Sequence, residues 1–433
     1  MATTPARRLG LFDLTMLATG AAIGSGVFRT PAAIAAHVPS PVWMLAVWAL
    51  GGVVTVAGAL TFAELGAMMP RAGGMYVYLS EAYGELVGFL QGWAYFLVVA
   101  TGAIAALAIV FAEYVSFFVP LGPSGRTILA LGALAGLAAI NVAGVRAAAS
   151  ASGVLTALKL AALAALVLFG LFATPKTAPS WTAGAAPSSS AAAAAMVGVL
   201  WSYGGWQHAT FAAGEARRPA RDVPLGVVIG TVLVTVAYLA TNATYLRLLP
   251  IAAIAASPMV ASDAAEIAIG RAGASFIAGS IALSALGTAG IYTLTSPRVY
   301  WTMAERGLFF RALAALHPRF RTPARAIVLQ TAWASVLVLF WGSFERLISY
   351  VVFVDWIFFG LTGAAVFVLR KKAPRAERPY KVLFYPVTPL LFVGVAAWFV
   401  GSTLWGQPRE ALAGGALLAL GVPVFYAWAR RRA

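Results

Sequence analysis

The sequence predicts an all-α membrane protein with about twelve transmembrane helices, and two observations lead to this prediction. Of the 433 residues, 61% are hydrophobic and only 10% are charged, and the mean hydropathy is +0.87. A soluble protein of this length could not cover its surface with so few polar side chains. The apolar residues also gather in stretches long enough to cross a bilayer as helices. We expect these near 11–36, 41–69, 86–119, 127–146, 150–173, 191–213, 224–248, 272–303, 326–343, 347–370, 383–404 and 411–429.

The distribution of basic residues predicts the orientation of these helices. If the N-terminus lies in the cytoplasm, the inner loops and tails hold 22 of the 30 Lys and Arg residues, and the outer loops hold six. The remaining two, Arg29 and Lys159, lie inside spans. This excess on one side is the positive-inside pattern, so we expect both termini in the cytoplasm. The net charge of +16 follows from this pattern and does not indicate a nucleic-acid partner.

Several classes of protein are disfavoured by what the sequence lacks. There is no cysteine, which excludes disulfides, thiolate metal sites and cysteine nucleophiles. The three histidines, His37, His208 and His317, are far apart in sequence and do not resemble a metal-binding set. No nucleophile–base pair is recognisable, so we expect no enzyme activity, no metal and no cofactor. The first span lacks a small-residue cleavage site, so it is not a signal peptide, and residues 1–433 form a single membrane domain.

Two glycine-rich breaks interrupt the predicted helices. Gly24-Ser25-Gly26 lies in the middle of the first span, and Tyr203-Gly204-Gly205 interrupts a span about 180 residues later. Each glycine weakens a helix by about 1 kcal/mol relative to alanine, and unwinding frees backbone groups that lipid cannot satisfy. Glycine breaks in corresponding positions of two halves are typical of the substrate site of an inverted-repeat transporter.

The first break has complementary ends. The outer half of the span begins near Val27, and its N-terminal N–H groups and partial positive charge suit a carboxylate. The inner half ends near Ala22 and Ile23, whose freed carbonyls suit an ammonium group, and Ser25 adds a hydroxyl. This arrangement predicts a site for a zwitterion. The expected substrate-binding residues here are Ile23, Gly24, Ser25, Gly26 and Val27.

The second break should lie opposite the first if the two halves are inverted repeats. Trp201, Tyr203 and Trp206 flank it, and a large aromatic ring beside a pair of glycines can cover a substrate. The alternative interpretation is that these rings only pack between helices. The residues assigned here to substrate binding are Trp201, Ser202, Tyr203 and Gly204.

Lys159 is the only lysine inside a span. At 1.5 Å per residue it lies roughly 14 Å deep, near the bilayer centre. Charges at this depth usually face the bundle interior and mark ion or proton pathways, so we assign Lys159 to coupling. The alternative is a fixed cation that ties helices together. Ser284 and Thr288 share a helix face and are further candidates for substrate binding. The sequence does not decide the roles of Arg29, Glu113 and Asp355.

An ordered series of motifs resembles the amino acid–polyamine–organocation (APC) superfamily, and specifically bacterial relatives of the L-type amino acid transporters. The resemblance covers nearly the whole chain. Its motifs are Gly24-Ser25-Gly26-Val27-Phe28, Ala63-Glu64-Leu65-Gly66, Pro70-Arg71-Ala72-Gly73-Gly74, Asn141 with Gly144-Val145-Arg146, Leu155-Thr156-Ala157-Leu158-Lys159-Leu160, Tyr203-Gly204-Gly205-Trp206, Gly214-Glu215 and Ser296-Pro297-Arg298-Val299-Tyr300.

The resemblance implies a LeuT-type fold with two five-helix inverted repeats, at about 11–173 and 191–370, and two additional helices at about 383–429. It implies that the backbone of residues 23–27 binds the α-amino and α-carboxylate groups. Trp201 matches the position of the gating aromatic of the family. Lys159 matches the lysine of proton-coupled permeases and sodium-independent exchangers, so sodium coupling is not expected.

These features together predict a secondary transporter (permease) that moves amino acids across a bacterial cytoplasmic membrane by alternating access, as an exchanger (antiporter) or with proton coupling. The alternative is a non-transporting amino-acid sensor, which the short segments before Leu11 and after Ala429 disfavour. Two departures from the family pattern, Gly290 in place of Asn and Trp201 in place of Phe, leave the substrate side chain open. The loop 120–126 has no cysteine, so no disulfide-linked accessory subunit is expected.

Overall fold

The computed structural model describes residues 7–175, 181, 184–341, 344–406 and 408–432. Helices make up nearly all of this part of the chain, and its only β-type pairing is a single parallel bridge between Leu9 and Ala216. The helices are α1 (Leu11–Ala22), α2 (Gly26–His37), α3 (Pro41–Met68), α4 (Met75–Tyr83), α5 (Glu85–Ala94), the π-helix η1 (Tyr95–Val99), α6 (Ala100–Val115), α7 (Pro123–Ala143), α8 (Val145–Phe172), α9 (Ser189–Tyr203), α10 (His208–Phe211), the 3-10 helix η2 (Ala213–Glu215), α11 (Pro219–Leu248), α12 (Ile251–Ala256), α13 (Val260–Ile269), α14 (Arg271–Thr295), α15 (Pro297–Glu305), the 3-10 helix η3 (Arg311–Ala314), α16 (Ala324–Trp341), α17 (Phe344–Lys372), α18 (Val387–Gly406) and α19 (Pro408–Arg432).

The predicted all-helical membrane fold is confirmed, because ten segments of the described chain are long and apolar enough to cross a bilayer. Two shorter apolar helices, 189–203 and 324–340, lie where the sequence predicts further spans. The first of these is short because the second glycine break ends it at Tyr203. Two parts of these predictions lie outside the described residues. They are Lys176, one of the six basic residues expected in outer loops, and residues 342–343 at the end of the span expected near 326–343.

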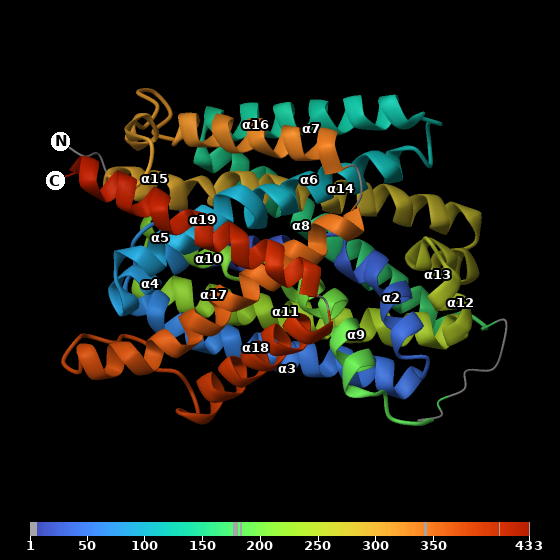
Figure 1. Cartoon of the computed structure of the whole chain (residues 1–433). Helices are drawn as coiled ribbons and strands as arrows, with labels where there is room; N and C mark the ends of the chain where they lie inside the picture. The colour runs from blue at the N-terminus through green and yellow to red at the C-terminus, as the bar shows by residue number, and fades with distance from the viewer. Residues whose placement is uncertain (1–6, 176–180, 182–183, 342–343, 407, 433) are drawn as a thin grey trace.

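The spans run roughly side by side along the long axis of the molecule, and both termini lie at the same end (Figure 1). The first broken span is at the centre of the bundle. Its inner segment α1 packs against α8, α11 and α14, whereas α2 packs against α9 and α12. The two broken spans therefore contact each other directly through α2 and α9.

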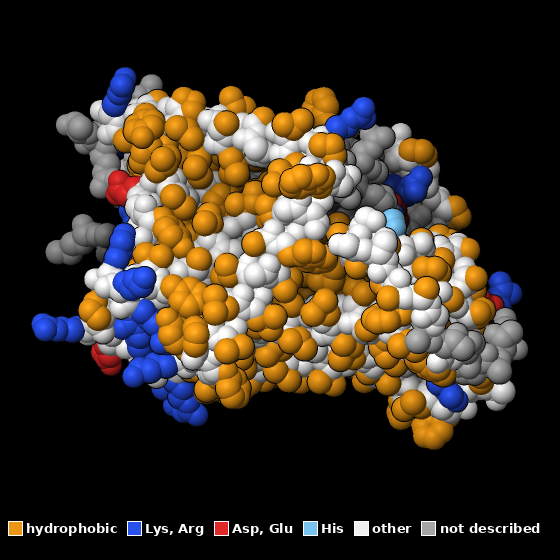
Figure 2. Space-filling view, turned by 60° about the horizontal axis from the view of Figure 1, so that its bottom comes forward, with side chains coloured by type: hydrophobic (Ala, Val, Ile, Leu, Met, Phe, Trp, Pro, Cys, Tyr) orange, Lys and Arg blue, Asp and Glu red, His pale blue; other side chains and the backbone are white. Residues whose placement is uncertain are grey.

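The surface of the molecule divides into an apolar band and a basic end. Figure 2 shows orange hydrophobic side chains over the length of the bundle, and blue Lys and Arg side chains concentrated at the end where Figure 1 places both termini. Large apolar residues such as Ile128, Phe172 and Val236 are exposed on helices of this band. Such a surface is stable in lipid, where exposed apolar side chains carry no cost.

Buried ion pairs link helices near the basic end. The Glu64 carboxylate accepts hydrogen bonds from Arg370 Nε at 3.0 Å and Nη2 at 2.7 Å, and from the Val382 N–H at 2.8 Å. Arg298 Nε donates to Glu215 Oε1 at 2.9 Å, and both side chains are almost fully buried. Removing one partner of such a pair leaves an uncompensated charge, which is strongly destabilising.

Candidate substrate site

The first predicted break is present in the structure. Helix α1 ends at Ala22, and α2 begins at Gly26. Ile23 leaves the helical conformation with φ −76° and ψ 77°, and the Gly24 N–H donates to the Ala22 carbonyl at 2.8 Å. The first turn of a helix has N–H groups without intrahelical acceptors, and the last turn has carbonyls without donors. Both kinds of group therefore meet inside the bundle.

The Lys159 side chain satisfies the carbonyl end of this break. Its Nζ donates to the carbonyls of Ile23 at 2.6 Å, Gly20 at 3.0 Å and Ser284 at 3.3 Å, and to Thr288 Oγ1 at 2.9 Å. Lys159 is 2% exposed. An ammonium group has three donors, so these four acceptors are enough to satisfy it. Lys159 thus contacts the inner half of the first span, where the sequence analysis expects freed carbonyls.

The Ser284 and Thr288 hydroxyls also form hydrogen bonds with carbonyls of the break. Ser284 Oγ lies 3.1 Å from both the Ile23 and the Gly24 carbonyl oxygens, and Thr288 Oγ1 donates to the Gly20 carbonyl at 2.8 Å. The Ile23 carbonyl, expected from the sequence to receive a substrate ammonium, is therefore already surrounded by donors of this chain.

The second predicted break is also present. Helix α9 ends at Tyr203, and α10 begins at His208. Gly205 has φ +111°, and its N–H donates to Gln207 Oε1 at 2.9 Å. A Cβ at Gly205 would collide with the backbone carbonyl of Ala21. This position needs glycine both for its backbone conformation and because the two broken spans approach each other here.

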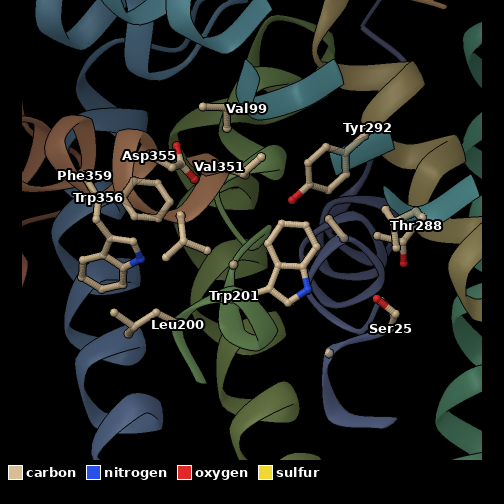
Figure 3. A pocket seen from close by; sticks show the side chains of 17 residues that line it. Ser25, Val99, Leu200, Trp201, Thr288, Tyr292, Val351, Asp355, Trp356 and Phe359 are labelled. Carbon is tan, nitrogen blue, oxygen red and sulfur yellow. The ribbon is translucent and has the colours of Figure 1, made fainter. Parts of the chain in front are cut away.

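A small cavity lies between the two breaks, and Figure 3 shows the side chains around it. Helices α1, α2, α6, α9, α14 and α17 contribute to its wall, together with η1 and both breaks. It offers about 30 Å³ to water molecules, and one buried water needs at least about 10–15 Å³ of such space. The cavity is thus nearly filled by its own lining, with the Trp201 indole in the middle of the view in Figure 3.

The cavity includes some of the predicted substrate-binding residues and leaves out others. Those that line it are Gly24, Ser25, Gly26, Trp201, Gly204 and Thr288. Those that do not are Ile23, Val27, Ser202, Tyr203 and Ser284, and the coupling candidate Lys159 also lies outside the lining.

The aromatic and hydroxyl residues outside the lining have structural contacts. The Tyr203 hydroxyl donates to the Trp48 carbonyl at 3.1 Å, and its ring packs on Trp48 and Tyr238. Ser202 Oγ lies 2.8 Å from Thr30 Oγ1 on α2. These two side chains hold α9 against its neighbours and do not point into the cavity.

Ser25 differs from the other hydroxyls of the site. Its Oγ is buried at the cavity wall and has no hydrogen-bond partner among the described residues. A buried hydroxyl without a partner is costly. It lies beside the N-terminus of α2, whose N–H groups and dipole attract a negative charge. The site therefore presents several unused donors at one point.

Apart from Thr288, and Asp355 whose role is left open, the sequence analysis does not anticipate the wall formed by η1, α14 and α17. Val99, Tyr292, Asp355, Trp356 and Phe359 line the cavity from these helices. The spans that carry them have no glycine break, so no local pattern singles them out. The π-helix at Tyr95–Val99 is a feature often found at functional sites, but it has no clear signal in the sequence.

Two interrupted helices around a small buried cavity, inside a bundle of apolar spans, define a membrane transporter. Residues 9–413 match the amino acid permease family, and the chain belongs to this family. The predicted resemblance to the APC superfamily and to L-type transporters is thereby confirmed.

Curated relatives span nearly the whole chain. The serine/threonine exchanger SteT of Bacillus subtilis is 32% identical over 99% of this chain and 98% of its own length. The human large neutral amino acids transporter small subunit 2 is 32% identical over 97% of this chain and 80% of its own length. The human b(0,+)-type amino acid transporter 1 is 30% identical over 94% of this chain and 84% of its own length. All three relatives are named as transporters or exchangers of amino acids.

Proposed function

We propose that this protein is a secondary transporter that moves amino acids across the bacterial cytoplasmic membrane by alternating access. The single observation that carries the proposal is the buried Ser25 hydroxyl, which has no hydrogen-bond partner in the described part of the chain, in a cavity between two broken helices. The names of the relatives support amino acids as the substrate class. In this proposal the spans at 11–173 and 191–370 are two inverted repeats of a LeuT-type fold, and those at 383–429 are additional.

The two groups of the amino-acid backbone have different partners in this proposal. The α-carboxylate accepts hydrogen bonds from Ser25 and from the first N–H groups of α2. The α-amino group lies against the end of α1, where Ala21 and Ala22 line the cavity. The Ile23 carbonyl is left to Lys159, which donates to it, and the Ser284 and Thr288 hydroxyls also lie within hydrogen-bond distance of it.

Lys159 makes sodium coupling unfavourable in this proposal. Its ammonium lies among the Gly20, Ile23 and Ser284 carbonyls, a set of oxygens that otherwise suits a bound cation. A second cation there would be repelled. Transport is therefore sodium-independent, as exchange or with proton coupling. The basic end with both termini faces the cytoplasm, following the positive-inside rule, and no disulfide-linked accessory subunit is needed.

The test is uptake of each proteinogenic amino acid into proteoliposomes, with and without amino acids inside, in sodium or choline buffer. We expect saturable uptake of a subset of amino acids, at the same initial rate in both buffers. Uptake that depends steeply on sodium would contradict the proposed coupling. Binding of an amino acid without any flux would favour the sensor alternative.

Trp201→Ala tests the proposed gate. The indole fills the cavity, so we propose that it moves to admit a substrate and then closes over it. The variant should fold, because Trp201 is only partly buried, but it should lose affinity and discriminate less between large and small amino acids. Competition assays on the purified variant measure this. Unchanged affinity, rate and selectivity would identify Trp201 as a packing residue.

A further inference from the structure

Asp355 places a carboxylate in the wall of the cavity. It belongs to α17, is partly exposed, and is the one charged side chain among the described residues that line this space. In Figure 3 it lies on the opposite side of Trp201 from Ser25. A molecule that binds Ser25 at one end could therefore reach Asp355 with its other end once the indole moves.

Asp355 differs from three other acidic residues of the bundle in having no basic partner among the described residues. Glu64 pairs with Arg370, Glu113 with Arg29, and Glu215 with Arg298. Asp355 forms no hydrogen bond or ion pair with any described residue. An unpaired charge inside a membrane protein is expensive, and such residues usually mark a substrate or ion pathway. An ionised Asp355 therefore needs a cation from outside the described chain.

The lining around Asp355 suits an organic cation better than a metal ion. Trp356, Phe359 and Trp201 line the same cavity, and aromatic faces attract ammonium and guanidinium groups. A hard metal ion needs several oxygen ligands, and no set of three metal-binding side chains occurs among the described residues. Lys159 cannot supply the charge here, because its amine is held by the α1 carbonyls.

We propose that Asp355 selects amino acids with a cationic side chain, such as lysine, ornithine or arginine. This inference rests on the proposed transport function and names its substrate class. The α-carboxylate binds at Ser25, and the aliphatic part of the side chain lies along the apolar wall. The terminal ammonium or guanidinium donates to the Asp355 carboxylate, so the substrate itself completes the ion pair.

The experiment compares arginine with citrulline, which has nearly the same shape but no charge. Inhibition constants of both are measured against a labelled substrate in proteoliposomes of the wild type, Asp355→Asn and Asp355→Glu. We expect the wild type to prefer arginine by about tenfold or more, as for a charged hydrogen bond. Asp355→Asn should lose this preference through weaker arginine binding, with citrulline unaffected, and Asp355→Glu should keep part of it.

The control is Glu266→Gln, which removes an exposed carboxylate on α13, outside the cavity. It should keep the wild-type ratio, and the thermal unfolding of each variant shows whether it is folded. Transport of neutral amino acids with no preference for arginine would overturn this inference and leave the proposed function intact. If Asp355→Asn weakens the binding of arginine and of citrulline equally, the inference is also overturned, since Asp355 would then be needed for transport of any substrate. A wild-type protein that transports no amino acid would overturn both proposals.

Discussion

The two helix breaks look alike in sequence but are stabilised in different ways. At the first break, side chains from α8 and α14 donate to the freed carbonyls, with Lys159 at the centre. At the second break, Gln207 of the same segment accepts from the Gly205 N–H, and Gly205 packs against the Ala21 backbone. The first break thus depends on a distant charge, whereas the second depends on a local side chain and on close packing.

The first break is thus stabilised mainly by hydrogen bonds, and the second mainly by close backbone packing. Polar partners can be exchanged when helices move, because each donor at the first break has more than one acceptor within reach. A close backbone contact such as that of Gly205 with Ala21 allows no added atom. The first break is therefore the better candidate for a part that rearranges during transport, and the second for a fixed contact between the two broken spans.

Gly205→Ala should have the largest effect. The added Cβ would collide with the Ala21 carbonyl, and a non-glycine residue at φ +111° is strained by about 1–3 kcal/mol from its backbone conformation. We expect a marked fall in the thermal unfolding temperature of the purified protein. Gly24→Ala is the matched comparison at the first break, because its Cβ would meet Leu107 and Thr288 at 3.4 Å, an ordinary contact.

Gly24→Ala should therefore keep the unfolding temperature but weaken substrate binding, since Leu107 and Thr288 both line the cavity. Equal stability of the two variants would contradict the steric account of the second break. A substitution at Gly26 cannot separate an effect on substrate binding from an effect on helix packing. A Cβ there would lie 2.6 Å from the Ser202 Cα, so a substitution would disturb the packing of α2 on α9 as well as any bound substrate.

Lys159→Ala should have the next largest effect, on transport. Without the amine, the Gly20 and Ile23 carbonyls lose their charged donor, and the inner half of the first span is held less firmly. We expect the flux to change by about 5–150-fold, the range of a coupling free energy of about 1–3 kcal/mol, with a smaller change in equilibrium affinity. The test is to measure substrate flux and substrate binding of the variant and the wild type from about pH 5 to 8. If the flux and its dependence on pH are unchanged in the variant, Lys159 is a purely structural cation.

Tyr238→Phe should have the smallest effect. The Tyr238 hydroxyl lies 2.8 Å from the Ala22 carbonyl at the first break and 2.9 Å from the Ser202 carbonyl beside the second. It has only one proton to donate, so the variant loses about one hydrogen bond, or about 1 kcal/mol of stability. We expect a small fall in the unfolding temperature and a modest change in flux. A fall in the unfolding temperature as large as that of Gly205→Ala would mean that the Tyr238 hydroxyl is the main contact that stabilises the two breaks against each other.

Local sequence patterns were enough to predict the all-helical membrane fold and both breaks. The glycine pairs follow directly where α1 and α9 end, close to the predicted residues, because helix propensity acts over a few neighbouring positions. Only some of the expected substrate residues line the cavity, and their roles stay a prediction. Tyr203 follows the same pattern as Trp201, but its hydroxyl is used by the Trp48 carbonyl on α3, which no local rule reveals.

The sequence by itself determined that this chain is a helical membrane protein with two interrupted helices, because hydrophobic length and glycine pairs are local properties, and its ordered motifs indicated the family. Only the tertiary structure decided which groups meet at the breaks. It brings Lys159 onto the Ile23 carbonyl and leaves Asp355 beside the cavity without a partner among the described residues. These outcomes depend on how helices far apart in the chain rotate and pack, and the free energy of a buried charge is set by those neighbours.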